Sequence, residues 1–270
     1  MNQYFSIIKK EFYVRRFSLL GFTLASLAFL LLYVLIYPSF QSEASKFNEL
    51  LKAYPKALLQ AFNIEQLSIS NASGYISAEH FSFVWPLLAI FLAVGTATNS
   101  IAGEIEKATL ALSLSAPIKR VKLYLAKMTS GLLAVTGFVA FSILSLVPIT
   151  MINNVEIDNV HVLKLSILGL FFALAVYGIS LMISAIYSEK SKVYFWVGGI
   201  LLSMYVANII SGLVSSMKNL QYISFFHYFS GEKALVQGQL STQALVVFGM
   251  STLFALIIGL VVFKRRDINV

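Results

Sequence analysis

Cysteine is absent from the 270-residue sequence, and charged residues make up only 12% of it. The absence of cysteine excludes disulfides, thiolate catalysis and cysteine-based metal sites. The scarcity of charge argues against a soluble domain, in which about a quarter of the residues are charged. Apolar residues make up 58% of the chain, and its mean hydropathy is +0.81. We therefore predict an all-α polytopic membrane protein.

The sequence also lacks the usual marks of an enzyme. It has no phosphate-binding loop of the form G-x-x-x-x-G-K-[ST], and no spacing suggests a Ser/His/Asp arrangement. The three histidines, His80, His161 and His227, are far apart in the sequence, and we expect them in surface polar roles near the outer boundary. We therefore expect no catalytic residue, no metal site and no enzymatic activity in this chain.

Six apolar segments are long enough to cross a bilayer, which takes about 20 residues of helix. They form one transmembrane domain over residues 1–270, with spans predicted at 17–37, 81–101, 128–152, 162–187, 193–215 and 244–263. Residues 1–16 have the basic amphipathic pattern of a helix that lies in the headgroup layer. The remaining long polar segments are predicted as two outer loops, 38–80 and 216–242, and one loop on the opposite side, 102–127.

Basic residues are unevenly divided between the two sides. The N-terminal flank, the 102–127 loop, the turn at 188–192 and the C-terminal tail hold 14 of the 20 lysines and arginines. Because cytoplasmic flanks of membrane proteins are enriched in Lys and Arg, we predict that both termini and the 102–127 loop are cytoplasmic. The net charge of +8 is then explained by topology and contact with the bilayer, and we expect no nucleic-acid partner.

The middle of each predicted span contains no Asp, Glu, Lys or Arg. Intramembrane ionisable residues mark proton relays, so this absence argues against a proton-driven transporter and a charge-lined channel. The second and fifth spans instead carry small and neutral polar residues at helical spacing. Such residues allow close helix packing within one chain, or they line a dimer interface or a translocation path. The positions are Ala93, Ala97, Asn99, Gly199, Ser203, Ala207, Asn208 and Ser211.

The longest charged interruption on the predicted cytoplasmic side is residues 102–128. Two acidic residues, Glu104 and Glu106, lie at its start, and a basic cluster closes it. Between them is an amphipathic run that ends at Pro117, since proline cannot continue a helix interior. A membrane protein with so little mass outside the bilayer has few other places to receive a cytosolic signal.

This stretch resembles the signature of permease subunits of type-2 ATP-binding-cassette (ABC) exporters. The family pattern is A-G-E-x-E-x-G-T-L-E-x-L-L-x-x-P-[IV]-x-R, followed by a basic helix that ends near a lysine. The match covers Ile101–Lys127, with Ala108 in place of the usual glycine and Ala111 in place of the usual acid. Shorter resemblances lie at Lys9–Phe12, Tyr37–Phe40, Tyr54–Leu58 and Phe263–Ile268.

The resemblance implies that the 102–127 loop is a coupling helix that docks on a cytosolic ATPase. Two ATPase subunits and a second permease subunit, identical or different, are the implied partners, and the ATPase binds ATP and Mg while this chain holds no cofactor. The implied coupling residues are Glu104, Glu106, Thr109, Leu110, Leu112, Leu114, Pro117, Lys119 and Arg120. Residues 1–16 match the family's interfacial helix, and residues 216–229 match its outer re-entrant element.

The apolar spans favour export of hydrophobic or amphipathic cargo, such as a peptide, an antibiotic or a lipid. We expect the protein in a prokaryotic cytoplasmic membrane. Two alternatives remain open at the level of the sequence. One is a non-transport ABC component for sensing, immunity or assembly, and the other is an ATP-independent channel or facilitator. Co-purification with an ATPase distinguishes the last from the other two.

Overall fold

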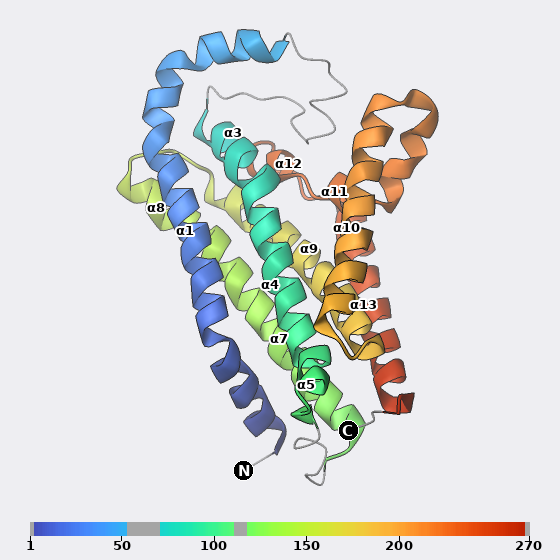
Figure 1. Ribbon diagram of the computed structural model, residues 1–270. Coiled ribbons are helices and arrows are strands. Elements are labelled where there is room, and N and C mark those ends of the chain that lie inside the picture. Colours follow the sequence, from blue (N-terminus) through green and yellow to red (C-terminus); the bar gives the residue numbers. More distant parts are fainter. Residues whose placement is uncertain (1–2, 53–70, 111–117, 268–270) are drawn as a thin grey trace.

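The computed structural model describes residues 3–52, 71–110 and 118–267, and every element in these ranges is a helix (Figure 1). Within them, six helical segments are long and apolar enough to cross a membrane. They are 3–39, 72–100, 120–152, 159–186, 190–213 and 242–265. Each overlaps one of the six predicted spans, so the all-helical class and the six candidate spans are confirmed.

The first span and the basic segment before it form one helix, α1 (Gln3–Lys52). The helix is not interrupted between residues 16 and 17, so the predicted interfacial segment continues directly into the span. Pro38 lies inside α1, and proline in a helix interior removes a backbone hydrogen bond and bends the helix. Figure 1 shows the C-terminal part of α1 bent sideways across the end of the bundle that lies opposite the two termini.

The second span consists of three consecutive segments, α3 (Ala72–Ile76), the π-helix η1 (Ser77–Val84) and α4 (Trp85–Ser100). The side chain of Asn71 caps α3 by accepting a hydrogen bond of 2.7 Å from the N–H of Gly74. Pro86 lies in the first turn of α4 and has no N–H to bond a carbonyl of the preceding π-helix. The change from π to α geometry therefore falls at the proline.

The third span is broken near its C-terminal end into α7 (Arg120–Leu144) and α8 (Leu146–Ile152). Pro148 has no N–H with which to bond the carbonyl of Leu144, four residues earlier, so the break falls one turn before the proline. At its other end α7 begins at Arg120, eight positions before the predicted span. The basic cluster of the predicted loop thus belongs partly to a helix.

The remaining spans are α9 (Asn159–Ile186), α10 (Lys190–Leu213) and α13 (Thr242–Arg265). Side chains cap two of them. Asp158 accepts a hydrogen bond of 2.7 Å from the N–H of Val160, and Ser241 accepts one of 3.3 Å from the N–H of Ala244. Between α10 and α13 lie the 3-10 helix η2 (Ser215–Ile223), α11 (Phe225–Tyr228) and α12 (Gly231–Leu235).

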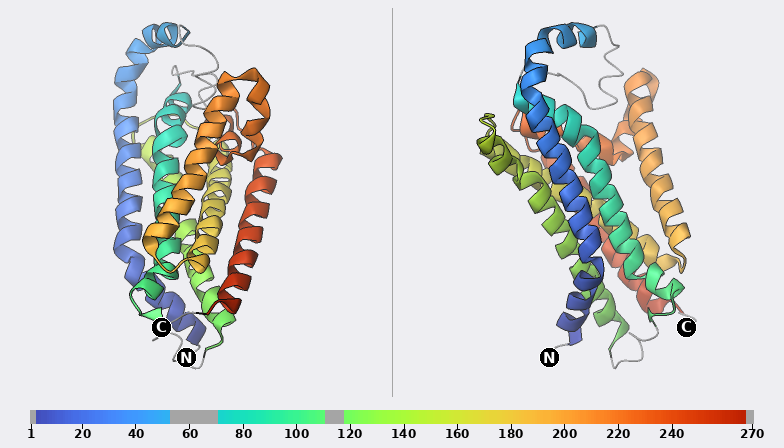
Figure 2. Two further views of the ribbon diagram at one scale, coloured as in Figure 1. Left: turned by 45° about the vertical axis from the view of Figure 1, so that its right-hand side comes forward. Right: turned by 60° about the vertical axis from the view of Figure 1, so that its left-hand side comes forward.

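The centre of the bundle is α9, which packs against α4, α7 and α13. Its closest neighbour is α13, because glycines allow the two backbones to approach. A Cβ at Gly178 would lie 3.3 Å from the Cα of Thr252, and one at Gly259 would lie 3.1 Å from the Cα of Met182. By contrast, α10 lies at the edge of the bundle, with η2 beside it (Figures 1 and 2).

Aromatic stacking joins the connection between α10 and α13 to the bundle. The buried ring of Trp85 stacks on Phe138 of α7 and on Phe229, at centroid distances of 6.2 and 5.7 Å. Its indole N–H donates a hydrogen bond of 2.8 Å to the Ser142 hydroxyl, which satisfies its polar group. Phe229 also contacts Phe172 of α9 at 4.8 Å. The aromatic run near residue 225 therefore packs into the bundle core.

Candidate functional site

The predicted coupling loop begins with a short helix, α5 (Ala102–Glu106), at the end of the bundle where both termini also lie (Figure 1). Its first N–H, that of Ala102, donates a hydrogen bond of 3.0 Å to the Ser184 hydroxyl of α9. The described chain continues to Leu110, so Leu112, Leu114 and Pro117 lie outside the described residues.

A left-handed turn ends α5. Ala108 has a positive φ, of +55°. The N–H of Thr109 donates a hydrogen bond of 2.9 Å to the carbonyl of Glu104, and the N–H of Ala108 donates one of 2.9 Å to the carbonyl of Ile105. This pair of hydrogen bonds is the Schellman motif, whose left-handed position is normally glycine. The motif explains why the family pattern has glycine at this position, and why Ala108 is strained there.

Glu104 joins α5 to two other helices by ion pairs. Its carboxylate lies 2.8 Å from the ammonium group of Lys127 in α7 and 3.3 Å from that of Lys10 in α1. The Lys127 side chain is only 1% exposed, and its ammonium group also lies 2.6 Å from the carboxylate of Glu11. A buried ammonium group is tolerated only when it is paired, and here two carboxylates pair with it.

Glu11 extends the network along α1. Its second oxygen pairs with the guanidinium group of Arg15, one turn later, and both side chains are almost completely buried. Arg15 also donates a hydrogen bond of 2.8 Å to the hydroxyl of Ser100 at the end of α4. The network of Glu11, Arg15, Glu104 and Lys127, which we call the ion network, therefore connects α1, α4, α5 and α7.

Glu106 connects α5 to a further helix. Its carboxylate accepts a hydrogen bond of 2.7 Å from the N–H of Lys190, the first residue of α10. A negative group at this position interacts favourably with the positive end of the helix dipole and satisfies an unpaired N–H. Glu104 and Glu106 were predicted as a pair of acids in the loop, and the structure gives each a different partner within the chain.

Of the predicted basic residues, Arg120 is engaged within the chain and Lys119 is exposed. The guanidinium group of Arg120 donates a hydrogen bond of 2.5 Å to the carbonyl of Arg266 in the C-terminal tail. Arg266 in turn donates to the carbonyl of Ala185 at 2.9 Å and to the Ser188 hydroxyl. Partial burial lowers the pKa of Arg266. These contacts fasten the tail to the turn between α9 and α10.

The other two residues predicted for coupling that the structure describes, Thr109 and Leu110, lie close to the chain's own core. Thr109 is partly buried, and its hydroxyl donates to the carbonyl of Glu104 at 3.3 Å. Leu110 is completely buried and belongs to the hydrophobic core of this chain. In the described structure, the apolar contact of Leu110 is therefore made within the subunit.

The small residues of the second and fifth spans divide into two groups. Ala93 and Ala97 of α4 are completely buried. Asn208 and Ser211 of α10 are almost completely buried. Gly199 and Ser203 lie on an exposed face of α10, and a Cβ added at Gly199 would meet nothing within 4 Å. The structure therefore does not bring the two groups together on one surface. Ala207 is intermediate in exposure, and Asn99 is exposed.

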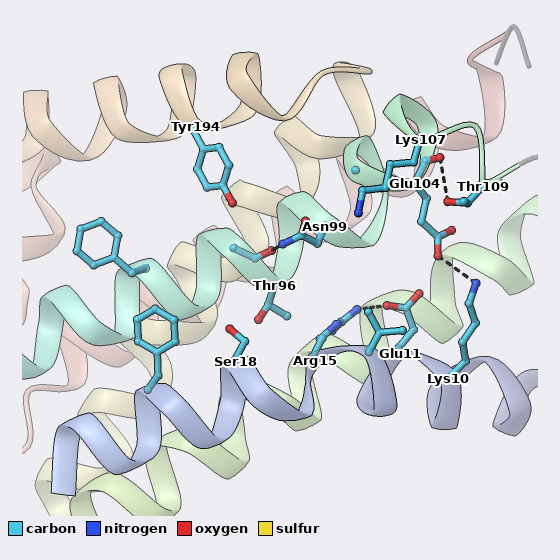
Figure 3. A pocket seen from close by; sticks show the side chains of 15 residues that line it. Lys10, Glu11, Arg15, Ser18, Thr96, Asn99, Glu104, Lys107, Thr109 and Tyr194 are labelled. Atoms are coloured by element: carbon cyan, nitrogen blue, oxygen red, sulfur yellow. Dashed lines mark hydrogen bonds and ion pairs between the residues drawn. The ribbon is translucent and has the colours of Figure 1, made fainter. Parts of the chain in front are cut away.

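A cleft of about 610 Å³ lies beside the ion network, between α1 and α4 (Figure 3). Its polar lining includes Lys10, Arg15, Asn99 and Lys107, and Tyr194 of α10 contributes from the far side. The amide of Asn99 donates a hydrogen bond of 2.8 Å to the carbonyl of Gly95, which fixes its orientation at the cleft wall. Of the predicted small and polar residues, only Asn99 lines this cleft.

Three members of the ion network were not predicted as site residues: Glu11, Arg15 and Lys127. The spacing of Glu11 and Arg15, one helical turn apart, is the signal that could have revealed their pairing. The prediction for the histidines was wrong for His80, whose ring is completely buried, with one nitrogen 3.5 Å from the Ser26 hydroxyl. No group of three or more potential metal ligands occurs among the described residues.

Comparison with protein-family models gives one finding. Residues 5–268 match the model described as ABC-2 family transporter protein. A comparison with curated protein sequences gave no match. The family match covers nearly the whole chain, from the first turn of α1 to beyond the end of α13.

Proposed function

The chain belongs to the ABC-2 family of transporter membrane proteins, and from this premise we propose that it is the membrane subunit of an exporter. Permeases of this family act with ABC ATPase subunits, which bind the nucleotide and its metal ion. The chain itself carries no phosphate loop. Its proposed partners are two cytosolic ATPase subunits and a second permease subunit of the same or another sequence.

The proposed docking site for the ATPase is α5 with the loop that follows it. The observation that carries this assignment is the set of contacts made by the two acids of α5. Glu104 contacts α1 and α7, while Glu106 contacts the first N–H of α10. A displacement of α5 by a bound ATPase therefore acts on three spans at once, without a chain of intermediate contacts.

The orientation of the subunit follows from the same end of the bundle. Both termini and α5 lie there together (Figure 1), and this end carries most of the basic residues in the sequence. Basic residues near membrane spans are retained on the cytoplasmic side. We place this end in the cytoplasm, where the exposed Lys119 is available to acidic groups of the ATPase.

The exposed face of α10 is the proposed contact with the second permease subunit. The small residues Gly199 and Ser203 leave this face shallow, and the exposed apolar side chains of Leu202 and Val206 flank it. Shallow faces allow close approach of helices in a membrane. The aromatic connection after α10 would then cap the path on the outer side, and the cargo would be hydrophobic or amphipathic.

The coupling assignment is tested in proteoliposomes that contain the permease and its ATPase. Charge reversal of both acids, Glu104→Lys with Glu106→Lys, is expected to abolish permease-dependent stimulation of ATP hydrolysis while membrane insertion is retained. Because Glu104 also belongs to the ion network, the single variant Glu106→Lys is measured beside it and is expected to reduce stimulation. Glu189→Lys is the matched control, since Glu189 is exposed and its ion pair in the described structure is with Lys192, three residues later.

Normal stimulation of the ATPase by both the double variant and Glu106→Lys would refute the coupling role of α5. Export itself is measured separately, as ATP-dependent release of a loaded amphipathic peptide from vesicles. Stimulated hydrolysis without any release of cargo would favour a non-transport ABC component over an exporter.

A further inference from the structure

We propose that the cleft between α1 and α4 binds an anionic phospholipid from the cytoplasmic leaflet. The phosphate would lie beside Arg15 and Lys107, and an acyl chain would extend along Phe22 and Phe91. The proposal rests on the cytoplasmic placement of this end of the bundle, and it does not require that the protein transports anything.

The cleft is polar at one end and apolar at the other. Arg15 and Phe22 both line it from α1, and seven residues of helix separate them by about 10 Å along the axis. On α4, Asn99 and Phe91 line it with a separation of about 12 Å. Because the chain enters the bilayer along α1 and returns along α4, the polar end is the one near the termini. This order matches a lipid whose headgroup is at the cytoplasmic surface.

The lining has an excess of positive charge. Three cationic residues and two glutamates line the cleft, namely Lys10, Arg15, Lys107, Glu11 and Glu104. The buried Lys127 pairs with both glutamates. With Lys127 included, four cationic groups face two carboxylates in this region. The cationic groups at the cleft are therefore only partly compensated. Basic pockets between spans on the cytoplasmic side are typical sites for anionic headgroups.

Two donors at the cleft lack acceptors in the described part of the chain. One guanidinium nitrogen of Arg15, Nη1, is buried without a hydrogen-bond partner, although the other is paired with Glu11 and Ser100. The ammonium group of Lys107 has no acceptor among the described residues, and Figure 3 shows its side chain extended over the cleft. Buried charged donors normally have partners, and a phosphate oxygen would supply one for Arg15. Lys107 is exposed, so it can bind the same phosphate without breaking a contact in the described structure.

The dimensions suit this ligand. A volume of about 610 Å³ is within the range of pockets that enclose small molecules and headgroups. The apolar end of the cleft is lined by the aromatic rings of Phe22 and Phe91, so an inorganic anion would leave that end unfilled. The phosphate of a phospholipid would accept hydrogen bonds from Arg15 and Lys107, and its acyl chain would cover the two phenylalanine rings at the same time.

The first experiment blocks the cleft. Gly95 lies in its wall, and a Cβ added there would meet only the Tyr194 hydroxyl, at 3.9 Å. Gly95→Leu therefore fills the cleft without a backbone clash. Gly137→Leu is the matched control, since a Cβ at Gly137 meets nothing within 4 Å and Gly137 does not line the cleft. Delipidated full-length protein is mixed with phosphatidylglycerol or phosphatidylcholine, and bound lipid is counted by native mass spectrometry.

The second experiment removes charge. Lys107→Gln is compared with Lys122→Gln, an exposed lysine of α7 that does not line the cleft. A cationic residue near a membrane surface contributes to anionic-lipid binding by a factor of about five. We expect wild-type protein to prefer phosphatidylglycerol, Lys107→Gln to bind it about fivefold more weakly, and Gly95→Leu to lose it. The two control variants are expected to bind as the wild type does.

Equal retention of phosphatidylglycerol and phosphatidylcholine by the wild type would overturn the proposal, as would wild-type binding by Gly95→Leu. Inorganic phosphate, added in excess, is expected to leave the lipid in place because it cannot cover the aromatic end. Displacement of the lipid by phosphate alone would show that the acyl chain does not bind along Phe22 and Phe91, contrary to the proposal. Should Gly95→Leu instead change only the dimer population, a second copy of the chain fills the cleft and the proposal is wrong.

Discussion

Lys127 and Glu11 lie 116 positions apart in the sequence and form a buried ion pair of 2.6 Å. The pair fixes the N-terminal turns of α1 against α7. Since Lys127 also pairs with Glu104, the same ammonium group fixes α5. One lysine thus joins α5, the proposed docking site, to both α1 and α7.

Substitution Lys127→Met is expected to destabilise the protein strongly. It leaves Glu11 and Glu104 near each other without their shared cation, and removal of one partner from a buried ion pair typically costs roughly 3–5 kcal/mol. The free energy of unfolding in detergent measures the loss. Lys122→Met, on the same helix but exposed, is expected to have little effect. The double variant Lys127→Met with Glu104→Gln should recover part of the loss, and equal stability of both lysine variants would contradict the role of the ion network.

Substitution Ala108→Gly is expected to stabilise the protein. Ala108 holds a left-handed conformation, which costs an L-residue roughly 1–2 kcal/mol and costs glycine almost nothing. The thermal unfolding midpoint should therefore rise. Ala207→Gly, in the interior of α10 with helical geometry, should lower the midpoint because glycine costs about 1 kcal/mol in a helix. A fall in both variants would show that Ala108 is not strained.

Substitution Glu106→Gln is expected to loosen the start of α10. The carboxylate of Glu106 accepts the N–H of Lys190, and a neutral amide is a weaker acceptor at a helix N-terminus. Amide hydrogen exchange in the first turn of α10 should become faster, while exchange in α9 stays unchanged. Glu189→Gln is the control, since the Glu189 side chain does not cap α10. Unchanged exchange in the Glu106 variant would indicate that this contact does not stabilise the helix.

Substitution Gly131→Ala is expected to destabilise the contact between α7 and α9. A Cβ at Gly131 would lie 2.0 Å from the hydroxyl of Tyr177, which is completely buried and cannot move aside easily. Overpacking of this kind typically costs about 1–3 kcal/mol. Gly137→Ala, two turns later on the same helix and in open space, should be neutral or stabilising. Unfolding in detergent distinguishes the two, and equal midpoints would refute the predicted clash.

The spans and the family could be predicted from the sequence because both depend on local pattern. Runs of apolar residues indicate where a helix can cross the bilayer. Pro148 could be located in the third span, although only the structure shows that α7 and α8 separate before it. The sequence also shows alanine in place of the usual glycine at position 108, but only the structure shows the left-handed backbone conformation of that residue. The ion network could not be predicted, because its members come from three segments that only tertiary packing brings together. Basic residues near the predicted spans were used to predict the orientation of the chain in the membrane, and this use did not indicate that Lys127 forms buried ion pairs between helices.

The continuity of α1 has one further consequence. Its membrane segment, residues 3–39, contains 37 residues, which corresponds to a rod of about 55 Å. The hydrocarbon core of a bilayer is only about 30 Å thick, so the rod extends beyond it and is held at one end through Glu11 and Arg15. Residue 39 lies about 40 Å along the helix from Glu11 and Arg15. A rotation of about 10° around these two residues therefore moves that end sideways by about 7 Å, by simple geometry from the helix rise. A small angular change on one side of the membrane thus becomes a large lateral displacement on the other.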